Sequence, residues 1–239
     1  QTLHIQAASG QTHTYDGTLG AGTLDVSGAG TQVLRSSGAD TDLTVSGGNL
    51  VLQGKADVDG AHLSYGNLVN NGKLAIQASD NALTAVNTTL SVENATFGSG
   101  STTTFTLNTD ADMTASFIKA SGDIVIENGA AFHVTSIPGV NITWKSGNPM
   151  ELTLMELTGA GTIDLGENTL TVGGLFLTYY KNAHLVQEGD KVVLKAEEQT
   201  DNIYAGVADT ANSMAGANRI WEAARHCSVD QAGTDFTAA

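Results

Sequence analysis

Closely spaced aspartate residues are the side chains of this sequence best suited to chemistry. Asp16 and Asp25 lie near two glycine-rich turns in the stretch YDGTLGAGTLDVSG. Asp57 and Asp59 stand two positions apart in ADVDG, on the same face of the chain if it is extended. Two carboxylates that share a proton catalyse hydrolysis in aspartic proteases, and paired carboxylates also cleave glycosidic bonds. Asp16 and Asp25 are therefore the candidate catalytic pair.

The residues around this pair do not form a protease motif. An aspartic protease holds each carboxylate in an apolar-Asp-Thr/Ser-Gly loop. In LDVSG, Val26 separates Asp25 from the serine, and in YDGT the glycine and threonine after Asp16 are reversed. Solvated turn aspartates are therefore the favoured interpretation, and a non-catalytic role is expected before an enzymatic one.

Metal binding is the second chemistry that the aspartates suggest. Asp57 and Asp59 in DVDG resemble part of a calcium loop and are the candidate metal ligands. The full EF-hand spacing and the glycine-rich nonapeptide repeat of calcium-binding coils are both absent. The six histidines are scattered, and Cys227 is the single cysteine, so no zinc site is predicted. No cofactor is expected.

The composition indicates a soluble β-protein that avoids nucleic acid. Among 239 residues, 28 are glycine and 2 are proline, a bias that favours short strands joined by tight turns. Lys and Arg number 10 against 25 Asp and Glu, which gives a net charge of −15. Such a surface repels phosphate backbones, so no nucleic-acid partner is expected. No apolar run approaches the roughly 20 residues that span a bilayer as a helix.

A loose repeat positions these residues. Each unit is an alternating apolar strand, a Gly or Asn turn, and a second strand. Val26 and Val45 hold equivalent places in the first two units, and Leu50 and Leu68 follow similar GN dipeptides at nearly the same spacing. Such units cannot bury an apolar face alone, so we expect them to stack as a solenoid, with positive-φ Gly and Asn at its corners. A β-sandwich of glycine-turned hairpins remains the alternative. The units are GTLDVSGAGTQVL, TDLTVSGGNLVL, YGNLVNNGKLAI, NTTLSVENATF, SGDIVIENGAAFHV and GAGTIDLGENTLTVGG.

The remaining chain is expected to close the stack. The stretch LFLTYYKNAHLVQEGDKVVLKA predicts a hairpin that turns at EGD. Beyond residue 200, apolar residues at helical spacing after the candidate N-cap Asp201 predict an α-helix. The expected segments are solenoid repeats over 1–137, a capping β-region over 138–199, a linker helix over 200–227 and a flexible tail over 228–239.

This order of elements resembles the C-terminal part of a bacterial autotransporter passenger, a product of type V secretion. The stretches that carry the resemblance are LTVSGGNLVL, LTGAGTIDLGENTLTVGG, LFLTYYKNAHLVQEGDKVVLKAEE and NIYAGVADTANSMAGANRIWEAA. The resemblance implies a right-handed parallel β-helix, an autochaperone cap that assists folding, and a helix leading to an outer-membrane barrel in the same polypeptide.

From this resemblance we expect a structural or adhesive stem that is secreted or displayed on the bacterial surface. Its expected partners are extracellular glycans or host glycoproteins. Two alternatives stay open. One is an extracellular hydrolase of glycoproteins or polysaccharides that uses Asp16 and Asp25, and the other is a glycan-binding module without catalysis. The sequence names neither ligand nor substrate.

Overall fold

The computed structural model describes residues 1–55, 61–77, 87–107, 117–136, 150–173 and 180–198, together with 227–229 and 236–238. The chain divides into two units, Gln1–Glu198 and Gln199–Ala239. The described residues are all β, and their main sheets are built largely from parallel pairs.

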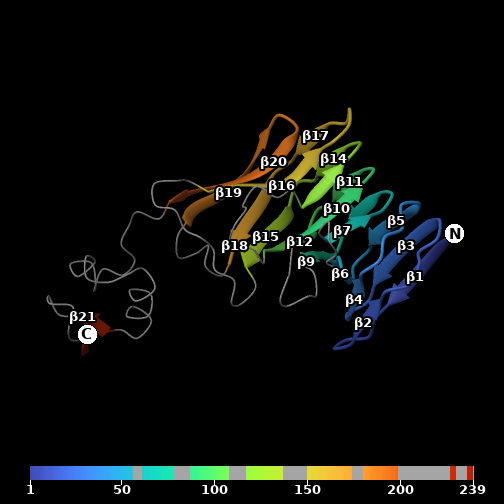
Figure 1. Cartoon of the computed structure of the whole chain (residues 1–239), viewed down its shortest axis with the longest axis horizontal. Coiled ribbons are helices and arrows are strands. Elements are labelled where there is room, and N and C mark those ends of the chain that lie inside the picture. Colours follow the sequence, from blue (N-terminus) through green and yellow to red (C-terminus); the bar gives the residue numbers. More distant parts are fainter. Residues whose placement is uncertain are drawn as a thin grey trace. The chain divides into compact units, whose positions relative to one another are not determined.

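Three sheets make up the first unit; the chain first alternates between two of them and then visits all three in rotation (Figure 1). We call one passage through the sheets a coil. The first sheet contains β1 (Thr2–Gln6), β3 (Gly22–Ser27), β5 (Thr41–Val45), β8 (Leu68–Asn70), β11 (Ala95–Phe97), β14 (Ile124–Ile126) and β17 (Ile163–Leu165). The second contains β2 (Thr12–Tyr15), β4 (Thr31–Leu34), β6 (Asn49–Gln53), β9 (Lys73–Gln77), β12 (Thr102–Leu107), β15 (Ala130–Ser136) and β18 (Asn168–Val172). The third contains β7 (Ala61–Ser64), β10 (Thr88–Val92), β13 (Ile118–Ala120), β16 (Met150–Leu157), β19 (Tyr180–Glu188) and β20 (Lys191–Glu198).

Strand pairing joins one coil to the next and does not join neighbours in sequence until the C-terminal hairpin. Val26 pairs in parallel with Val45, which confirms that predicted equivalence. The predicted equivalence of Leu50 and Leu68 is wrong, because Leu50 pairs with Leu74 in the second sheet while Leu68 lies in the first. Consecutive strands such as β5 and β6 lie in different sheets, so they are not the hairpins of the sandwich alternative.

The reason for the wrong equivalence is that the coils lengthen along the chain. In the first sheet, Gly22 pairs with Thr41, Leu43 pairs with Leu68, and Ile124 pairs with Ile163, so the sequence separation of partners grows steadily. The sequence separation of partners begins to grow where the third sheet begins, at β7. Each coil from there on carries an added strand, so one fixed period cannot describe the stack.

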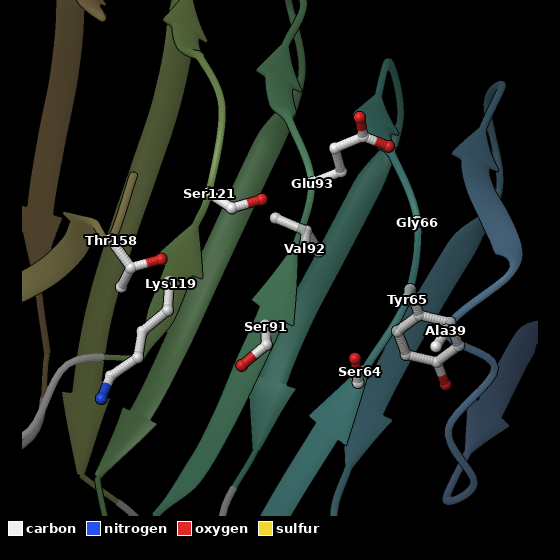
Figure 2. Close-up of a pocket in the computed structure, with 10 residues that line it drawn as sticks. All are labelled: Ala39, Ser64, Tyr65, Gly66, Ser91, Val92, Glu93, Lys119, Ser121 and Thr158. Atoms are coloured by element: carbon white, nitrogen blue, oxygen red, sulfur yellow. The ribbon is translucent and has the colours of Figure 1, made fainter. Parts of the chain in front are cut away.

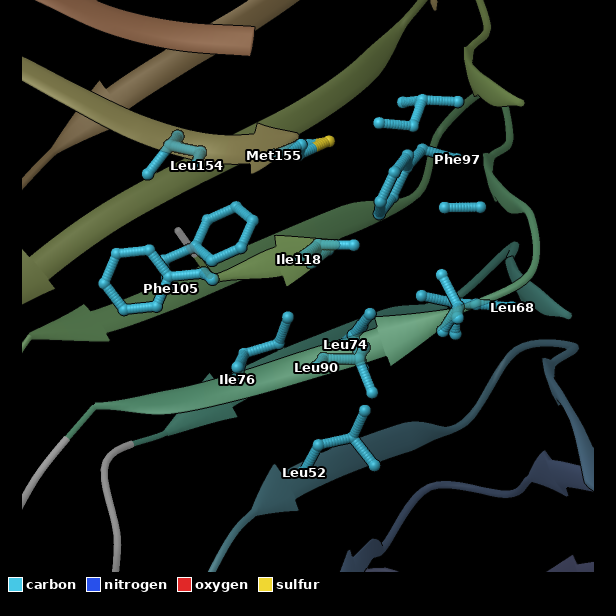
Figure 3. Close-up of a cluster of buried hydrophobic side chains, with 14 of the residues drawn as sticks. Leu52, Leu68, Leu74, Ile76, Leu90, Phe97, Phe105, Ile118, Leu154 and Met155 are labelled. Atoms are coloured by element: carbon cyan, nitrogen blue, oxygen red, sulfur yellow. The ribbon is translucent and has the colours of Figure 1, made fainter. Parts of the chain in front are cut away.

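The core runs through the interior between the three sheets. Alternate residues of β5 and β6 are buried, and Leu43, Val45 and Leu52 have no exposed surface. Figure 3 shows apolar side chains from successive strands converging on this interior. Phe97 and Phe132 meet edge to face, with ring centroids 5.4 Å apart. Alternation of apolar and polar residues therefore positions one face of each strand from β3 to β16 on a shared core.

Hydrogen bonds from polar side chains link successive coils at one corner. Asn67 donates through its backbone N–H (2.7 Å) and its amide (2.9 Å) to Asp42 Oδ1. Asn94 donates to Asn67 Oδ1 at 2.7 Å and accepts from the Asp123 N–H at 2.7 Å. Thr162 then donates to Asp123 Oδ1 at 2.7 Å through its backbone. We call these five residues the corner ladder; it spans five coils.

The corner asparagines do not adopt the positive φ that the sequence suggested. Among the described residues that are not glycine, Asn182 alone has a positive φ. Asn67 and Asn94 bridge coils through their side chains instead. Glycine serves close stacking as well as turning: a Cβ on Gly161 would lie 2.1 Å from the Gly122 carbonyl oxygen of the preceding coil.

The predicted hairpin closes the third sheet. β19 and β20 pair antiparallel around a turn at Gly189, whose φ is +57°. β20 then pairs antiparallel with β16, and Val192 and Leu194 are fully buried beneath it. Lys195 reaches Glu151 at 3.2 Å and also contacts Glu188. The hairpin thus covers the edge that β16 would otherwise expose.

The second unit contributes a short antiparallel pair, β21 (Cys227–Val229) with β22 (Phe236–Ala238). The predicted helix over 200–227 lies outside the described residues except for Cys227, which begins β21. Most of the predicted tail also lies outside them. No helical segment in the part of the chain described here is long and apolar enough to cross a membrane.

Candidate functional site

The two aspartates of the candidate catalytic pair have different partners. Asp25 lies on the outward face of β3, where its Oδ2 is 2.8 Å from Nδ1 of His4 on the neighbouring strand β1. Asp16 follows β2 in the second sheet and forms an exposed ion pair with Lys55 at 3.3 Å. No hydrogen bond between the two carboxylates occurs in this described region. The geometry therefore gives each carboxylate its own partner, a histidine for Asp25 and a lysine for Asp16, and no shared proton.

Asp25 is the more constrained of the two carboxylates. Burial by itself raises its pKa, but hydrogen bonding to Ser46 and His4 and the charge of His4 outweigh that effect. They hold the pKa of Asp25 below its ordinary value of 3.8. Its Oδ1 is buried close to Ser46, and this proximity favours the ionised form. Asp25 therefore remains a carboxylate at neutral pH, which suits an ion pair and not a general acid.

The candidate metal ligands Asp57 and Asp59 lie outside the described residues. Within the residues that are described, no group of three or more His, Cys, Asp or Glu side chains is placed to hold a metal ion.

A polar groove crosses the third sheet near the ends of four successive strands, β7, β10, β13 and β16 (Figure 2). Its volume is about 330 Å³. Ser64, Ser91 and Lys119 lie in register on the first three of these strands. The lining residues are Ala39, Ser64, Tyr65, Gly66, Ser91, Val92, Glu93, Lys119, Ser121 and Thr158. We call this feature the polar groove.

The backbone beneath the polar groove is engaged between coils. The Glu93 N–H donates to the Gly66 carbonyl at 2.8 Å, and the Ser121 N–H donates to the Val92 carbonyl at 3.1 Å. Tyr65 is buried, and its hydroxyl donates to the Ser36 carbonyl. Burial raises the pKa of Tyr65, so its phenol stays neutral. The groove therefore has a fixed floor and offers a ligand side-chain groups.

The charged side chains of the polar groove have no partner within the described structure. The Lys119 ammonium and the Glu93 carboxylate make no hydrogen bond or ion pair with another described residue. Figure 2 shows Lys119 on the left of the pocket and Glu93 near its upper edge, with the Ser121 hydroxyl between them. The groove thus combines donors and acceptors that remain available to a ligand.

Sequence reasoning missed the polar groove. Ser64, Ser91 and Lys119 come from segments far apart in sequence, and only the coil lengths bring them into register. The local signal is an outward polar residue near the end of each third-sheet strand, in AHLS, TTLSV and IKA. That pattern is also the ordinary pattern of a solvated strand face, so it did not single the site out.

Comparisons with protein-family models, with curated proteins and with solved structures gave no match.

Proposed function

We propose that residues 1–198 form a right-handed parallel β-helix that serves as the structural and adhesive stem of a secreted, surface-displayed autotransporter passenger. The observation that carries the proposal is the parallel, in-register stacking of coils around one core, closed by an antiparallel hairpin. In such a stack each coil contacts mainly its neighbours, so the chain builds a rod whose length follows the number of coils.

The surface of the stack suits exposure outside a cell. The net charge of −15 favours solubility, and many outward strand positions carry Thr, Ser, Asp or Asn. In this proposal an outer-membrane barrel in cis carries the passenger across the membrane, and extracellular glycans or host glycoproteins are its partners. A hydrolase receives less support, because Asp16 and Asp25 contact different partners, Lys55 and His4, and not each other.

The hairpin formed by β19 and β20 is proposed to assist folding as well as to close the sheet. Its buried Val192 and Leu194 pack on the common core, and its strands are joined by a tight turn at Gly189. A local antiparallel hairpin forms with little loop-closure cost, whereas each parallel pair, such as β4 with β6, must close a far longer loop. The hairpin can therefore present a ready template on which β16 and the coils before it assemble.

Surface labelling of the source bacterium tests the display. Antibodies raised against residues 1–198 are added to intact cells and to lysed cells, with and without external protease. We expect intact cells to be labelled and the label to disappear after protease treatment. Labelling that requires lysis would place the protein inside the cell and contradict the proposal.

A further inference from the structure

We propose that the polar groove binds a neutral, hydroxyl-rich polysaccharide chain that lies along the stack of coils. Ser64, Ser91 and Lys119 stand in register on neighbouring strands, which are about 4.8 Å apart. A sugar chain carries hydroxyl groups that recur on a comparable length, so one extended chain can meet all three side chains. The inference deepens the adhesive role proposed above and rests on it.

The charges of the groove favour a neutral ligand. Sugar hydroxyls can accept a hydrogen bond from Lys119 and donate one to Glu93, two charged groups that have no partner among the described residues. A polyanion would be attracted by Lys119 but repelled by Glu93 and by Glu156, which lies in register beside Lys119. The net charge of −15 would repel it further.

The groove is poorly suited to a peptide. The Glu93 and Ser121 backbone N–H groups already donate within the stack, so β-strand addition has no free edge there. The larger apolar lining residues, Tyr65 and Val92, are only 3% and 5% exposed, so no apolar pocket is open to an anchoring side chain.

Binding through hydroxyls without an exposed aromatic platform in the groove is expected to be weak. We expect dissociation constants in the millimolar range for short oligosaccharides. Many copies displayed on one surface would raise the effective affinity without any new contact. Weak, multivalent binding of this kind fits a stem that adheres to a polymer.

A titration followed by backbone amide resonances tests the inference on the full chain. The probes are maltohexaose, xylohexaose and chitohexaose as neutral chains, and a heparin-derived hexasaccharide as the polyanion, each up to roughly 10 mM. We expect at least one neutral probe to shift the amide signals of Ser91, Lys119 and Ser121 in a saturable way. The inference is overturned if no neutral probe shifts them, or if the heparin fragment binds more tightly than all three.

Matched lysine variants locate the binding site. Lys119→Met removes the groove ammonium, and Lys73→Met removes an exposed lysine from β9 in the second sheet. We expect Lys119→Met to weaken binding of the neutral probe about tenfold and Lys73→Met to leave it unchanged. Ser91→Val serves as a second groove variant and should also weaken binding. Equal affinity in all three variants would overturn the site.

Surface display is measured separately by antibody labelling. Displayed protein that binds no neutral probe would therefore refute the inference while leaving the proposed display intact.

Discussion

Asn94 holds neighbouring coils together through both ends of its amide. Its Nδ2 donates to Asn67 in one coil, and its Oδ1 accepts from the Asp123 N–H in the next. Both partners are distant in sequence, so the sequence shows an asparagine near a turn but not its role. Turn chemistry alone predicted a positive φ for the corner asparagines. Asn94 does not have a positive φ, and it links the coils through its side chain instead.

Substitution of Asn94 tests the corner ladder. Asn94→Ala removes both amide hydrogen bonds and leaves a backbone donor without its partner, so we expect a loss of about 1–2 kcal/mol in the free energy of unfolding. Asn94→Asp keeps the acceptor and regains an O–H donor when its carboxyl is protonated, so at low pH its loss should be smaller than that of Asn94→Ala. Urea denaturation provides the measurement. A change of less than about 0.5 kcal/mol in Asn94→Ala would show that the ladder is not stabilising.

Asp25 makes stability depend on pH in a defined direction. Its pKa in the folded protein lies below the ordinary value of 3.8, so folding favours the carboxylate. The resulting stabilisation is present at pH values well above 3.8 and is lost as the pH falls through the lower, folded pKa. At neutral pH the carboxyl of Asp25 is ionised in both the folded and the unfolded chain, and its contacts with Ser46 and His4 favour the folded one.

Asp25→Asn should therefore lower the free energy of unfolding at pH 7 by on the order of 0.5 kcal/mol, since His4 is largely exposed. The deficit should shrink towards pH 3. Asp164→Asn, on the outward face of β17, serves as the control. Thermal unfolding between about pH 5 and pH 3 measures both, and a deficit that grows as the pH falls through this range is incompatible with a carboxylate stabilised in its ionised form.

Among the elements, the hairpin was predictable from sequence and the coil register was only partly so. Glu-Gly-Asp between two alternating strands is a local turn signal, and it correctly located the turn of β19 and β20. The pairing of Val26 with Val45 was also correct, because the early coils are of similar length and both residues lie in the same sheet. The match of Leu50 with Leu68 failed because similar dipeptides recur in different sheets once the third strand is added.

The proposed role of the hairpin in folding predicts whether each of two core substitutions changes mainly the folding rate or mainly the unfolding rate. Leu194 in β20 and Leu43 in β5 are both fully buried, so truncating either to alanine should cost about 2–5 kcal/mol. If the hairpin assembles first, Leu194→Ala should mainly slow refolding, while Leu43→Ala should mainly speed unfolding. Stopped-flow refolding and unfolding in urea separate the two rates. The reverse division would show that the early coils, and not the hairpin, seed folding.

At the scale of the whole molecule, the two ends of the first unit differ. The third sheet ends beneath a hairpin. In the other two sheets the last strands, β17 and β18, and the first strands, β1 and β2, each have one edge without a partner strand among the described residues. Leu3 and Tyr15 are 61% and 39% exposed on β1 and β2, while their in-register partners Leu24 and Leu34 are buried. Stability is therefore expected to increase from the first coil towards the hairpin, because each coil depends on its neighbours.

Cysteine cross-linking tests the parallel stacking of coils most directly. Thr44 and Val69 are in-register partners on β5 and β8, so Thr44→Cys with Val69→Cys, in a Cys227→Ser background, should form an intramolecular disulfide under mild oxidation. Thr44→Cys with Val51→Cys places the cysteines where a β5–β6 hairpin would bring them together, and this pair should remain reduced. Mass spectrometry of the oxidised monomers distinguishes the pairs. Cross-linking of Thr44→Cys with Val51→Cys, and not with Val69→Cys, would contradict the stacked coils.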